Sequence, residues 1–285
     1  MTIKIDYSRD KLFDEFSIRT LEDRYMVADE TSPQQAFARA AKVFSDDDDH
    51  AQRLYDYVSN HWFMFATPLL SNGGTERGLP ISCFLNYVDD SREGITEHYT
   101  ENAYLSSFGG GIGGTWSDIR AAGTKTSKGS ESTGVIPFMK VVDAEMLAFS
   151  QGITRRGSYA SYLHMSHPEI EEFLDIRKPT GGDTNRKCLN LHHGIVIPDK
   201  FMEIIHMATK TEGFDDSWEL IDPHSGEVKK VVSARTLWVK LLQNRMETGE
   251  PYLMFEDAVQ ADLPDFQKRK GLRVNHSNLC SEITL

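Results

Sequence analysis

Hydrophobic residues recur at helical spacing in the first part of the chain. Residues 32–35 read SPQQ, and Phe37, Ala40, Ala41 and Phe44 follow on what would be one helix face. Serine is a preferred helix cap, proline suits the first helical turn, and glutamine can bond back to the cap backbone. This pattern predicts a first helix that begins directly after Ser32.

A second apolar stripe follows the acidic run at residues 46–49. Leu54, Val58, Trp62 and Phe65 lie at helical spacing, and negative charge favours the positive end of a helix dipole. We therefore expect a second helix after a solvated acidic loop, and no metal site is needed to explain the acidic run.

Beyond residue 66 the pattern changes to short apolar runs that alternate with helical stretches. The apolar runs cover residues 83–88, 160–165, 194–197 and 252–255, and the helical stretches cover 95–108, 169–177 and 233–248, the last ending at Gly249. Such alternation is typical of an α/β domain. We expect a helical region at residues 1–66, an α/β domain at residues 67–285 and a mobile loop at residues 123–134.

Composition narrows the class of protein. With 285 residues, 39% of them hydrophobic, the chain is long enough to bury a core, and a net charge of −12 disfavours nucleic acid or an anionic membrane as the main partner. The most apolar run, residues 62–66, is too short to span a bilayer. We expect a cytoplasmic protein.

Three cysteines, Cys83, Cys188 and Cys280, are far apart and odd in number, which does not suit a secreted disulfide framework. Reduced thiols are expected, and a cysteine taken alone is more often a small buried hydrophobe than a reagent. His192 and His193 lack the spacing of a metal site, which favours structural histidines.

A glycine run at residues 109–114, GGGIGG, contains the pattern GxGxxG. It follows a helical stretch and precedes strand-like residues 115–119, which is the reverse of the order in a dinucleotide fingerprint. The glycines are better suited to close approach of backbone to a ligand or a strand. Residues 150–157, SQGITRRG, form either a polar turn or a loop that contacts a nucleotide.

The segment with the clearest chemistry is residues 277–283, in which Asn278, Cys280 and Glu282 alternate. In an extended backbone these three side chains would point to one side. Nucleophilic cysteine normally needs a histidine base, whereas a carboxylate raises the thiol pKa. A protonated thiol instead suits hydrogen-atom chemistry, in which the cysteine becomes a thiyl radical.

Residues 278–282, NLCSE, resemble the finger-loop motif of ribonucleotide reductase large subunits of the aerobic, small-subunit-dependent class. Other segments resemble the same family in order and spacing: residues 65–70, 81–85, 109–113, 118–120, 150–157, 167–174 and 248–251. The resemblance begins near residue 25. It implies a ten-stranded α/β barrel of two five-stranded halves, of which this chain would supply a short helical region, without a full ATP cone, and the first half up to the finger loop.

The resemblance also implies roles for single residues. Cys280 would become the thiyl radical that removes the 3′ hydrogen of a ribonucleoside diphosphate, Glu282 would take the 3′-hydroxyl proton, and Asn278 would bond the ribose. Cys83 would be the first member of the redox pair that reduces the 2′ carbon. Cys188 matches no catalytic cysteine of the family.

Further positions resemble binding residues of the family. Those on the substrate side are Thr67, Ser82 and Gly111. Those that would bind a deoxynucleotide effector are Asp90, Arg120, Gln151 and Arg155. Asp90 would accept from the deoxyribose hydroxyl, Arg120 would pair with phosphate, and the loop carrying the other two would relay effector identity to the substrate.

The partners implied are a metal-containing small subunit that supplies the radical, a second large subunit, dNTP and ATP effectors, and a carboxy-terminal half that completes the barrel; this chain would bind no metal itself. The sequence stops at Leu285, so we expect a split or truncated reductase that is inactive alone. The alternative is a non-catalytic nucleotide-binding remnant. Retention of Cys83, Asn278, Cys280 and Glu282 together favours the enzyme.

Overall fold

The computed structural model describes residues 3–151 and 155–284, and the side chains of residues 150–156 lie outside that description. Two compact units are present, Met1–Ser82 and Cys83–Leu285, and each is described by itself. The division falls later than the predicted boundary at residue 66. The reason is that helix α4 (Thr67–Asn72) packs on helix α2 (Pro33–Val43) and buries Leu70 in the helical core.

The first unit is helical. Its elements are η1 (Tyr7–Leu12), α1 (Glu15–Arg24), α2, α3 (Asp48–Ser59) and α4. The predicted start of the first helix is confirmed in α2, where the Ser32 hydroxyl accepts from the backbone N–H of Gln34 and the Gln35 side chain accepts from that of Ser32. Two backbone donors that a helix start would otherwise leave unpaired are thereby satisfied.

The predicted second helix is α3. The helix is shorter than the predicted apolar stripe, which continued to Phe65. Asp47 caps α3 by accepting from the backbone N–H of His50, and the helix ends at Ser59. His61 has a left-handed backbone (φ 61°), and a right-handed α-helix cannot continue through a residue in this conformation. Trp62 therefore lies beyond the helix and is 74% exposed, whereas Val58 is buried as expected.

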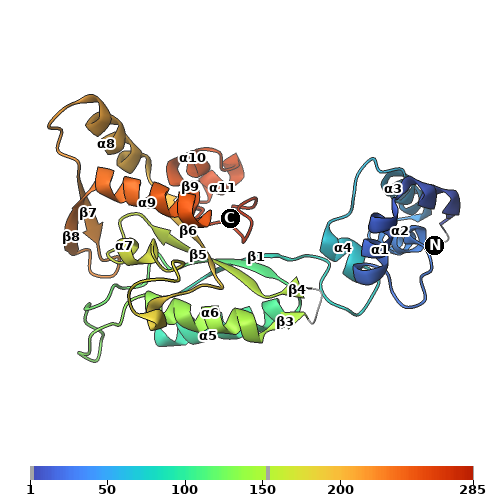
Figure 1. Ribbon diagram of the computed structural model, residues 1–285, viewed down its shortest axis with the longest axis horizontal. Coiled ribbons are helices and arrows are strands. Elements are labelled where there is room, and N and C mark those ends of the chain that lie inside the picture. The colour runs from blue at the N-terminus through green and yellow to red at the C-terminus, as the bar shows by residue number, and fades with distance from the viewer. Residues whose placement is uncertain (1–2, 152–154, 285) are drawn as a thin grey trace. The chain divides into compact units, whose positions relative to one another are not determined.

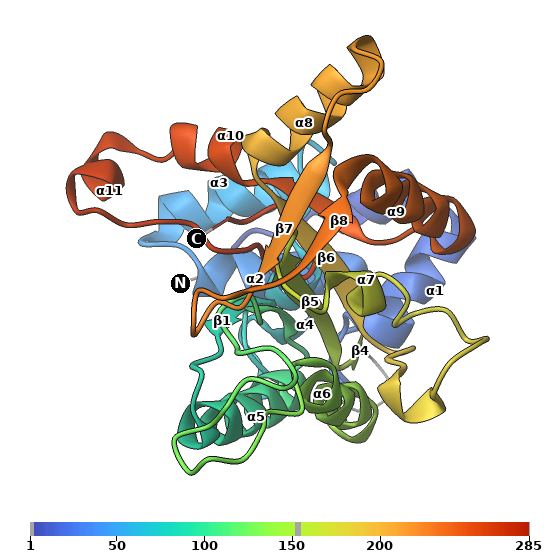
Figure 2. The same cartoon turned by 90° about the vertical axis from the view of Figure 1, so that its left-hand side faces the viewer.

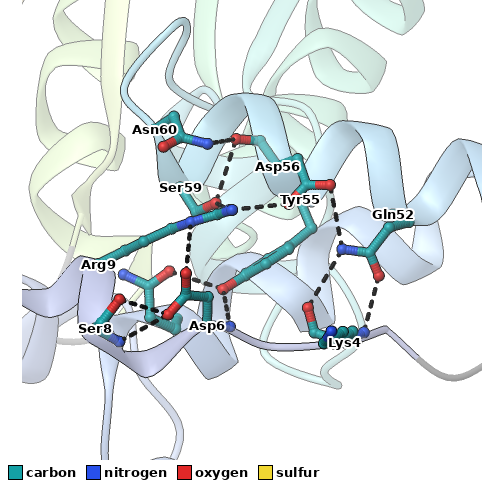
Figure 3. A network of polar contacts seen from close by, with 10 residues as sticks. Lys4, Asp6, Ser8, Arg9, Gln52, Tyr55, Asp56, Ser59 and Asn60 are labelled. Carbon is teal, nitrogen blue, oxygen red and sulfur yellow. Dashed lines mark hydrogen bonds and ion pairs between the residues drawn. The ribbon is translucent and has the colours of Figure 1, made fainter.

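A polar network joins η1 to α3 (Figure 3). Arg9 donates to Asp56 at 2.9 Å and to the Ser59 hydroxyl, and the Tyr55 hydroxyl accepts from the backbone N–H of Asp6 at 2.8 Å. Tyr55 is fully buried, so its polar end needs this partner. The network fixes the start of the chain on the helical core.

The second unit is built on a five-stranded parallel sheet in the order β1-β2-β5-β6-β9 (Figure 1). The strands are β1 (Cys83–Tyr87), β2 (Gly111–Thr115), β5 (Ser158–His164), β6 (His192–Ile197) and β9 (Tyr252–Phe255). Four of them fall on the predicted apolar runs, and β9 has the predicted limits. The order matches the expected five-stranded half of an α/β barrel.

The strand β2 corrects one prediction. We expected the glycine run to precede a strand at residues 115–119, but the glycines themselves form the strand, which pairs with β1 and β5 over its whole length. Glycine disfavours strands intrinsically, and here tertiary contacts override that preference. The predicted close approach is confirmed, because a Cβ on Gly114 would lie 1.8 Å from the Tyr159 hydroxyl.

Helices connect the strands and cover one face of the sheet. They are α5 (Arg92–Ser107), α6 (Ile136–Ala148), α7 (Ile170–Phe173), α8 (Asp199–Lys210) and α9 (Ala234–Thr248). Gly249 ends α9 in the left-handed conformation (φ 80°), as predicted. The predicted helix at 169–177 is only α7, because the carbonyls of Leu174 and Ile176 accept from Asn244 and Cys188 instead of continuing the helix.

The remaining elements of the second unit are short: β3 (Ser150–Gln151), β4 (Arg155–Arg156), η2 (Thr184–Arg186), β7 (Ser217–Ile221), β8 (Val228–Ser233), α10 (Glu256–Ala261) and α11 (Asp265–Arg269). The antiparallel hairpin β7–β8 was not predicted. Within the described residues, none of the helices is long and apolar enough to cross a membrane.

The two faces of the sheet differ. Tyr159 and Leu163 of β5 point into the large core under the helices. The alternate residues Ala160 and Tyr162 belong to a smaller cluster with β6, β9 and the segment at residues 274–279. Residues 274–279, with Val259 of α10 and Leu263, therefore pack on the opposite face of the sheet, which α5–α9 leave open.

Candidate active site

The segment predicted to carry the chemistry, residues 277–283, forms a tight turn, and we call this turn with its flanking residues 276 and 284 the finger loop. The backbone N–H of Asn278 donates to Ile283 O at 3.0 Å, that of Ser281 donates to Asn278 O at 3.3 Å, and Ser281 has a left-handed backbone (φ 65°). The prediction of an extended segment with three side chains on one side was therefore wrong. Asn278 is fully buried, whereas Cys280 is exposed.

The finger loop brings two predicted residues together. The Cys83 thiol, at the start of β1, donates to Glu282 Oε1 at 3.5 Å, although the two residues are 199 positions apart. Sulfur hydrogen bonds are long and weak, so either side chain can turn to a ligand. Cys83 and Glu282 thus meet, and Cys280 is exposed on the same loop as Glu282.

Asn278 shapes the turn from inside. Its side-chain oxygen accepts from the backbone N–H groups of Glu282 at 3.1 Å and Ile283 at 3.0 Å. Its amide nitrogen is buried and has no hydrogen-bond partner among the described residues. A buried donor without a partner is costly, and it is the type of group that a ligand can satisfy.

Strand β2 makes room for the finger loop. A Cβ on Gly113 would lie 1.9 Å from Ser277 O, so any other residue at this position would displace the loop. His276 donates from Nε2 to Gly113 O at 3.1 Å, and both His276 and Ser277 are buried. Gly111, predicted on the substrate side, pairs in register with Cys83 on the neighbouring strand.

Two other predicted substrate residues lie in the first unit. Thr67 begins α4, where its hydroxyl is 3.2 Å from the Tyr25 hydroxyl, and Ser82 is the last residue of that unit. Their predicted roles stay predictions.

Cys188 is fully buried in the core under the helices, and burial raises its thiol pKa to about 12. It therefore stays protonated and unreactive. This agrees with the sequence, which assigned it no catalytic role.

His192 and His193 share one acidic partner. Glu250 lies 2.5 Å from His192 Nδ1 and 2.9 Å from His193 Nδ1. Burial alone would raise the pKa of Glu250. The hydrogen bonds from the two histidines outweigh this effect and hold the pKa at about 2. The histidines thus link β6 to the start of β9, as the prediction of structural histidines implies.

A cavity of about 640 Å³ lies beside the sheet, between the start of α5 and the loop at residues 120–133. Arg120 Nε donates to both carboxylate oxygens of Asp90, at 3.1 and 2.9 Å, and both residues line the cavity. The wall is of mixed charge: the amino terminus of α5 and Lys128 contribute positive charge, and Glu93 and Glu131 contribute negative charge. The two predicted effector residues are thus adjacent, but they bond each other.

The other predicted effector residues are less informative. The backbones of Gln151 and Arg155 pair across strands β3 and β4. Their side chains lie outside the described residues, so the predicted relay from effector to substrate stays a prediction.

Two features near these sites were missed by the sequence analysis. Tyr162 contacts the finger loop from β5, and His224, in the turn of the β7–β8 hairpin, lies 3.2 Å from Asp90. The alternation of residues 158–164 could have placed Tyr162 on the open face, but no sequence signal joined it to a loop more than a hundred residues later.

Known proteins match both units of the chain. Residues 81–285 match the family model described as the ribonucleotide reductase barrel domain, and residues 11–78 match the model of its all-alpha domain. The chain is 47% identical over 278 residues to the ribonucleoside-diphosphate reductase large subunit of Invertebrate iridescent virus 6, covering 98% of this chain and 28% of that protein. With the large subunit of Invertebrate iridescent virus 3 it shares 42% identity, covering 99% of this chain and 51% of that one.

A solved structure is similar as well. The class Id ribonucleotide reductase alpha subunit of Actinobacillus ureae matches with a TM-score of 0.78 and 30% identity, covering 99% of this chain and 47% of that subunit. The chain thus spans about half or less of the length of these relatives. On the matches to both domain models, the chain belongs to the ribonucleotide reductase family.

Proposed function

We propose that this chain is the amino-terminal part of a ribonucleoside-diphosphate reductase catalytic subunit, which reduces ribonucleotides to 2′-deoxyribonucleotides by thiyl-radical chemistry. One observation carries the proposal: the Cys83 thiol meets the Glu282 carboxylate on the face where the loop exposes Cys280. A fold that needed these residues only for packing would have no reason to hold a thiol against a carboxylate whose loop also exposes a second thiol.

The proposed reaction assigns a separate step to each group. The Cys280 thiyl radical takes the 3′ hydrogen atom, which re-forms the S–H bond and leaves a radical on the sugar. Glu282 accepts the 3′-hydroxyl proton, and the 2′-hydroxyl takes a proton from the redox thiol pair and departs as water. Cys83 and a second cysteine then become a disulfide, which supplies two electrons and the hydrogen that the 2′ carbon gains. Glu282 returns its proton to the 3′ oxygen, and Cys280 returns its hydrogen atom to the 3′ carbon, which restores the thiyl radical.

Two features of the chain support binding of the ribose and the need for a further cysteine. The amide of Asn278 has a donor without a partner among the described residues, and because this side chain is buried under the turn, a ribose hydroxyl would reach it only with movement of the turn. The thiol that pairs with Cys83 is not Cys188, because that residue is buried under the opposite face. The second redox cysteine is therefore expected in the part of the relatives' length that this chain does not span.

The cavity beside Asp90 is the proposed site for a deoxynucleoside triphosphate effector. Arg120, Lys128 and the start of α5 offer positive charge to phosphate, and Asp90 can accept from a sugar hydroxyl. In the absence of a nucleotide the Asp90–Arg120 pair satisfies both charges. Binding would replace this pair with contacts to the ligand.

The proposal includes the partners that the family resemblance implies: a radical-generating small subunit and a second large subunit. Helices α5 and α6 lie side by side (Figure 1 and Figure 2). They expose large apolar side chains, with Tyr104 at 67% and Leu147 at 62% exposure. Such a surface on two neighbouring helices suits a dimer contact.

The test is a reductase assay. We expect the full-length subunit, supplied with its radical-generating partner and a dithiol reductant, to convert ribonucleoside diphosphates to deoxyribonucleoside diphosphates. A polypeptide of residues 1–285 alone should form no product, because the proposed second redox cysteine is not among its three cysteines. Absence of product from the full-length enzyme, or turnover by residues 1–285 alone, would contradict the proposal.

A further inference from the structure

One side chain of the sheet holds the finger loop at the turn that carries Cys280. The Tyr162 hydroxyl lies 3.2 Å from Asn278 O, to which it donates, and 2.8 Å from the Ser281 hydroxyl. With Ser281 as donor to Tyr162, both hydroxyl hydrogens have acceptors. These two bonds lie on either side of Cys280 in the sequence.

The neighbouring strands are shaped to admit this contact. A Cβ on Gly194 of β6 would lie 2.5 Å from Cε1 of the Tyr162 ring, so glycine is needed there to leave room for the ring. On the other side Gly113 of β2 leaves room for Ser277, as described above. Tyr162 is fully buried between them, so its ring has little freedom to move.

The backbone conformation of Ser281 depends on contacts such as the one with Tyr162. Ser281 has a left-handed backbone (φ 65°), which non-glycine residues rarely adopt and which surrounding contacts must maintain. Its hydroxyl is bonded to Tyr162, and its backbone N–H bonds Asn278 O, the acceptor of the Tyr162 hydroxyl. Loss of the Tyr162 hydroxyl would remove the contacts of the sheet with Asn278 O and the Ser281 hydroxyl, and only bonds within the loop would then hold the turn.

We propose that Tyr162 is the positioning residue that fixes Cys280 for hydrogen-atom abstraction, acting through Ser281 and the Asn278 carbonyl. The proposal rests on the proposed reductase function. Misplacement of reacting groups by about 1 Å can cost roughly 100-fold in rate. Tyr162 therefore acts on the chemical step rather than on substrate affinity.

The sheet offers a matched control in Tyr159. It lies on the same strand and is also fully buried, but its hydroxyl faces the helices, where it bonds His98 at 2.9 Å and Trp116 at 3.1 Å. Tyr159→Phe removes the same atom from a similarly buried, doubly bonded position. It measures what the loss of a buried tyrosine hydroxyl does to the fold alone.

The experiment compares full-length enzymes with their radical-generating partner. Tyr162→Phe should lower kcat by about 10-fold to 100-fold with the substrate KM nearly unchanged, whereas Tyr159→Phe should keep the parent kcat. The rate of alkylation of Cys280, followed by peptide mass spectrometry, should change in Tyr162→Phe and not in Tyr159→Phe. This second readout does not depend on turnover.

A double-mutant cycle tests the route through Ser281. If the two hydroxyls act as one contact, Tyr162→Phe combined with Ser281→Ala should be no slower than the slower single variant. An active parent with Tyr162→Phe equal to Tyr159→Phe in both kcat and Cys280 alkylation would overturn this inference alone. A parent that forms no deoxyribonucleotide would instead overturn the proposed function.

Discussion

At the scale of single residues, both proposed sites depend on ionisable side chains that are already engaged with each other. Glu282 accepts from Cys83, and Asp90 accepts from Arg120. A ligand must replace these contacts. Its binding free energy is therefore the difference between the free energy of its own contacts and that of the contacts it displaces. Substitution of one partner therefore changes the state of the other as well.

For the cavity, we predict that Arg120→Ala weakens binding of a deoxynucleoside triphosphate by about 1.5–3 kcal/mol, the usual size of a charged hydrogen bond, or roughly 10-fold to 150-fold in Kd. The loss has two sources: the phosphate contact disappears, and Asp90 loses its arginine partner, while His224 remains beside its carboxylate. Titration calorimetry on the full-length enzyme measures it.

Arg235→Ala is a suitable control, because Arg235 is exposed and lies outside the cavity lining. Its effector affinity should equal that of the parent. An Arg120→Ala enzyme with parental affinity would show that the effector binds elsewhere.

The sequence led us to propose reactive residues, but it did not predict their arrangement. The alternation of Asn278, Cys280 and Glu282 suggested an extended segment, whereas the left-handed Ser281 turns the chain so that Asn278 points inward. The backbone conformation of a serine in a turn has no reliable sequence signal. The contact of Tyr162 with this turn depends on long-range packing, which spacing within one segment cannot reveal.

At the scale of elements, the hairpin β7–β8 holds the loop that lines the cavity. Asp222, at the end of β7, is fully buried and accepts from the backbone N–H of Ala121 and from the Thr124 hydroxyl, both at 2.8 Å. Burial alone would raise the pKa of Asp222. These bonds and those from Ser225 outweigh this effect and hold the pKa at about 2. The ionised carboxylate is thus the form that the fold stabilises.

This linkage predicts a pH-dependent contribution to stability. A pKa lowered from 3.8 to about 2 corresponds to about 2 kcal/mol, which is present above pH 3.8 and is lost as the pH falls toward 2. Asp222→Asn should lower the free energy of unfolding by a similar amount at pH 7, measured by urea denaturation, and should flatten the acid side of the pH profile.

Asp215→Asn provides the comparison, since Asp215 also accepts from a serine backbone N–H and hydroxyl but is exposed. Its loss should be clearly smaller. Equal losses in the two variants, or an unchanged acid profile in Asp222→Asn, would show that the hairpin contact is not the source of the low pKa.

The sequence predicted regular elements where a local signal was strong. The cap at Ser32 and the left-handed Gly249 correctly marked one helix start and one helix end. The glycine run of β2 was misjudged, because its pairing with two neighbouring strands, and not its own propensity, makes it a strand. The hairpin β7–β8 was overlooked, although Asp222, Pro223, Ser225 and Gly226 are turn-forming residues and a valine-rich stretch follows them.

At the scale of the whole molecule, the five strands form an open sheet in which β1 and β9 each pair with one described neighbour. The finger loop lies on the face that helices leave uncovered, as expected for the interior of a barrel. The proposed chemistry accordingly needs residues from the remaining length of the relatives. In the proposed reaction, this chain would supply the radical cysteine Cys280, the carboxylate Glu282 and the redox thiol Cys83.

The central claim is that Cys280 starts the reaction while Cys83 supplies electrons after the sugar radical has formed. In the full-length enzyme with its radical source, we predict that Cys280→Ser leaves the nucleotide unchanged, because an alcohol O–H bond is too strong for the incoming radical to break. Cys83→Ser should still allow abstraction of the 3′ hydrogen, after which the unreduced intermediate decays, releases the base and inactivates the enzyme.

Base release and loss of the small-subunit radical, followed with isotopically labelled ribonucleoside diphosphate, measure this difference most directly. The account predicts base release from Cys83→Ser and none from Cys280→Ser. The same behaviour in both variants, whether both are inert or both release base, would contradict it.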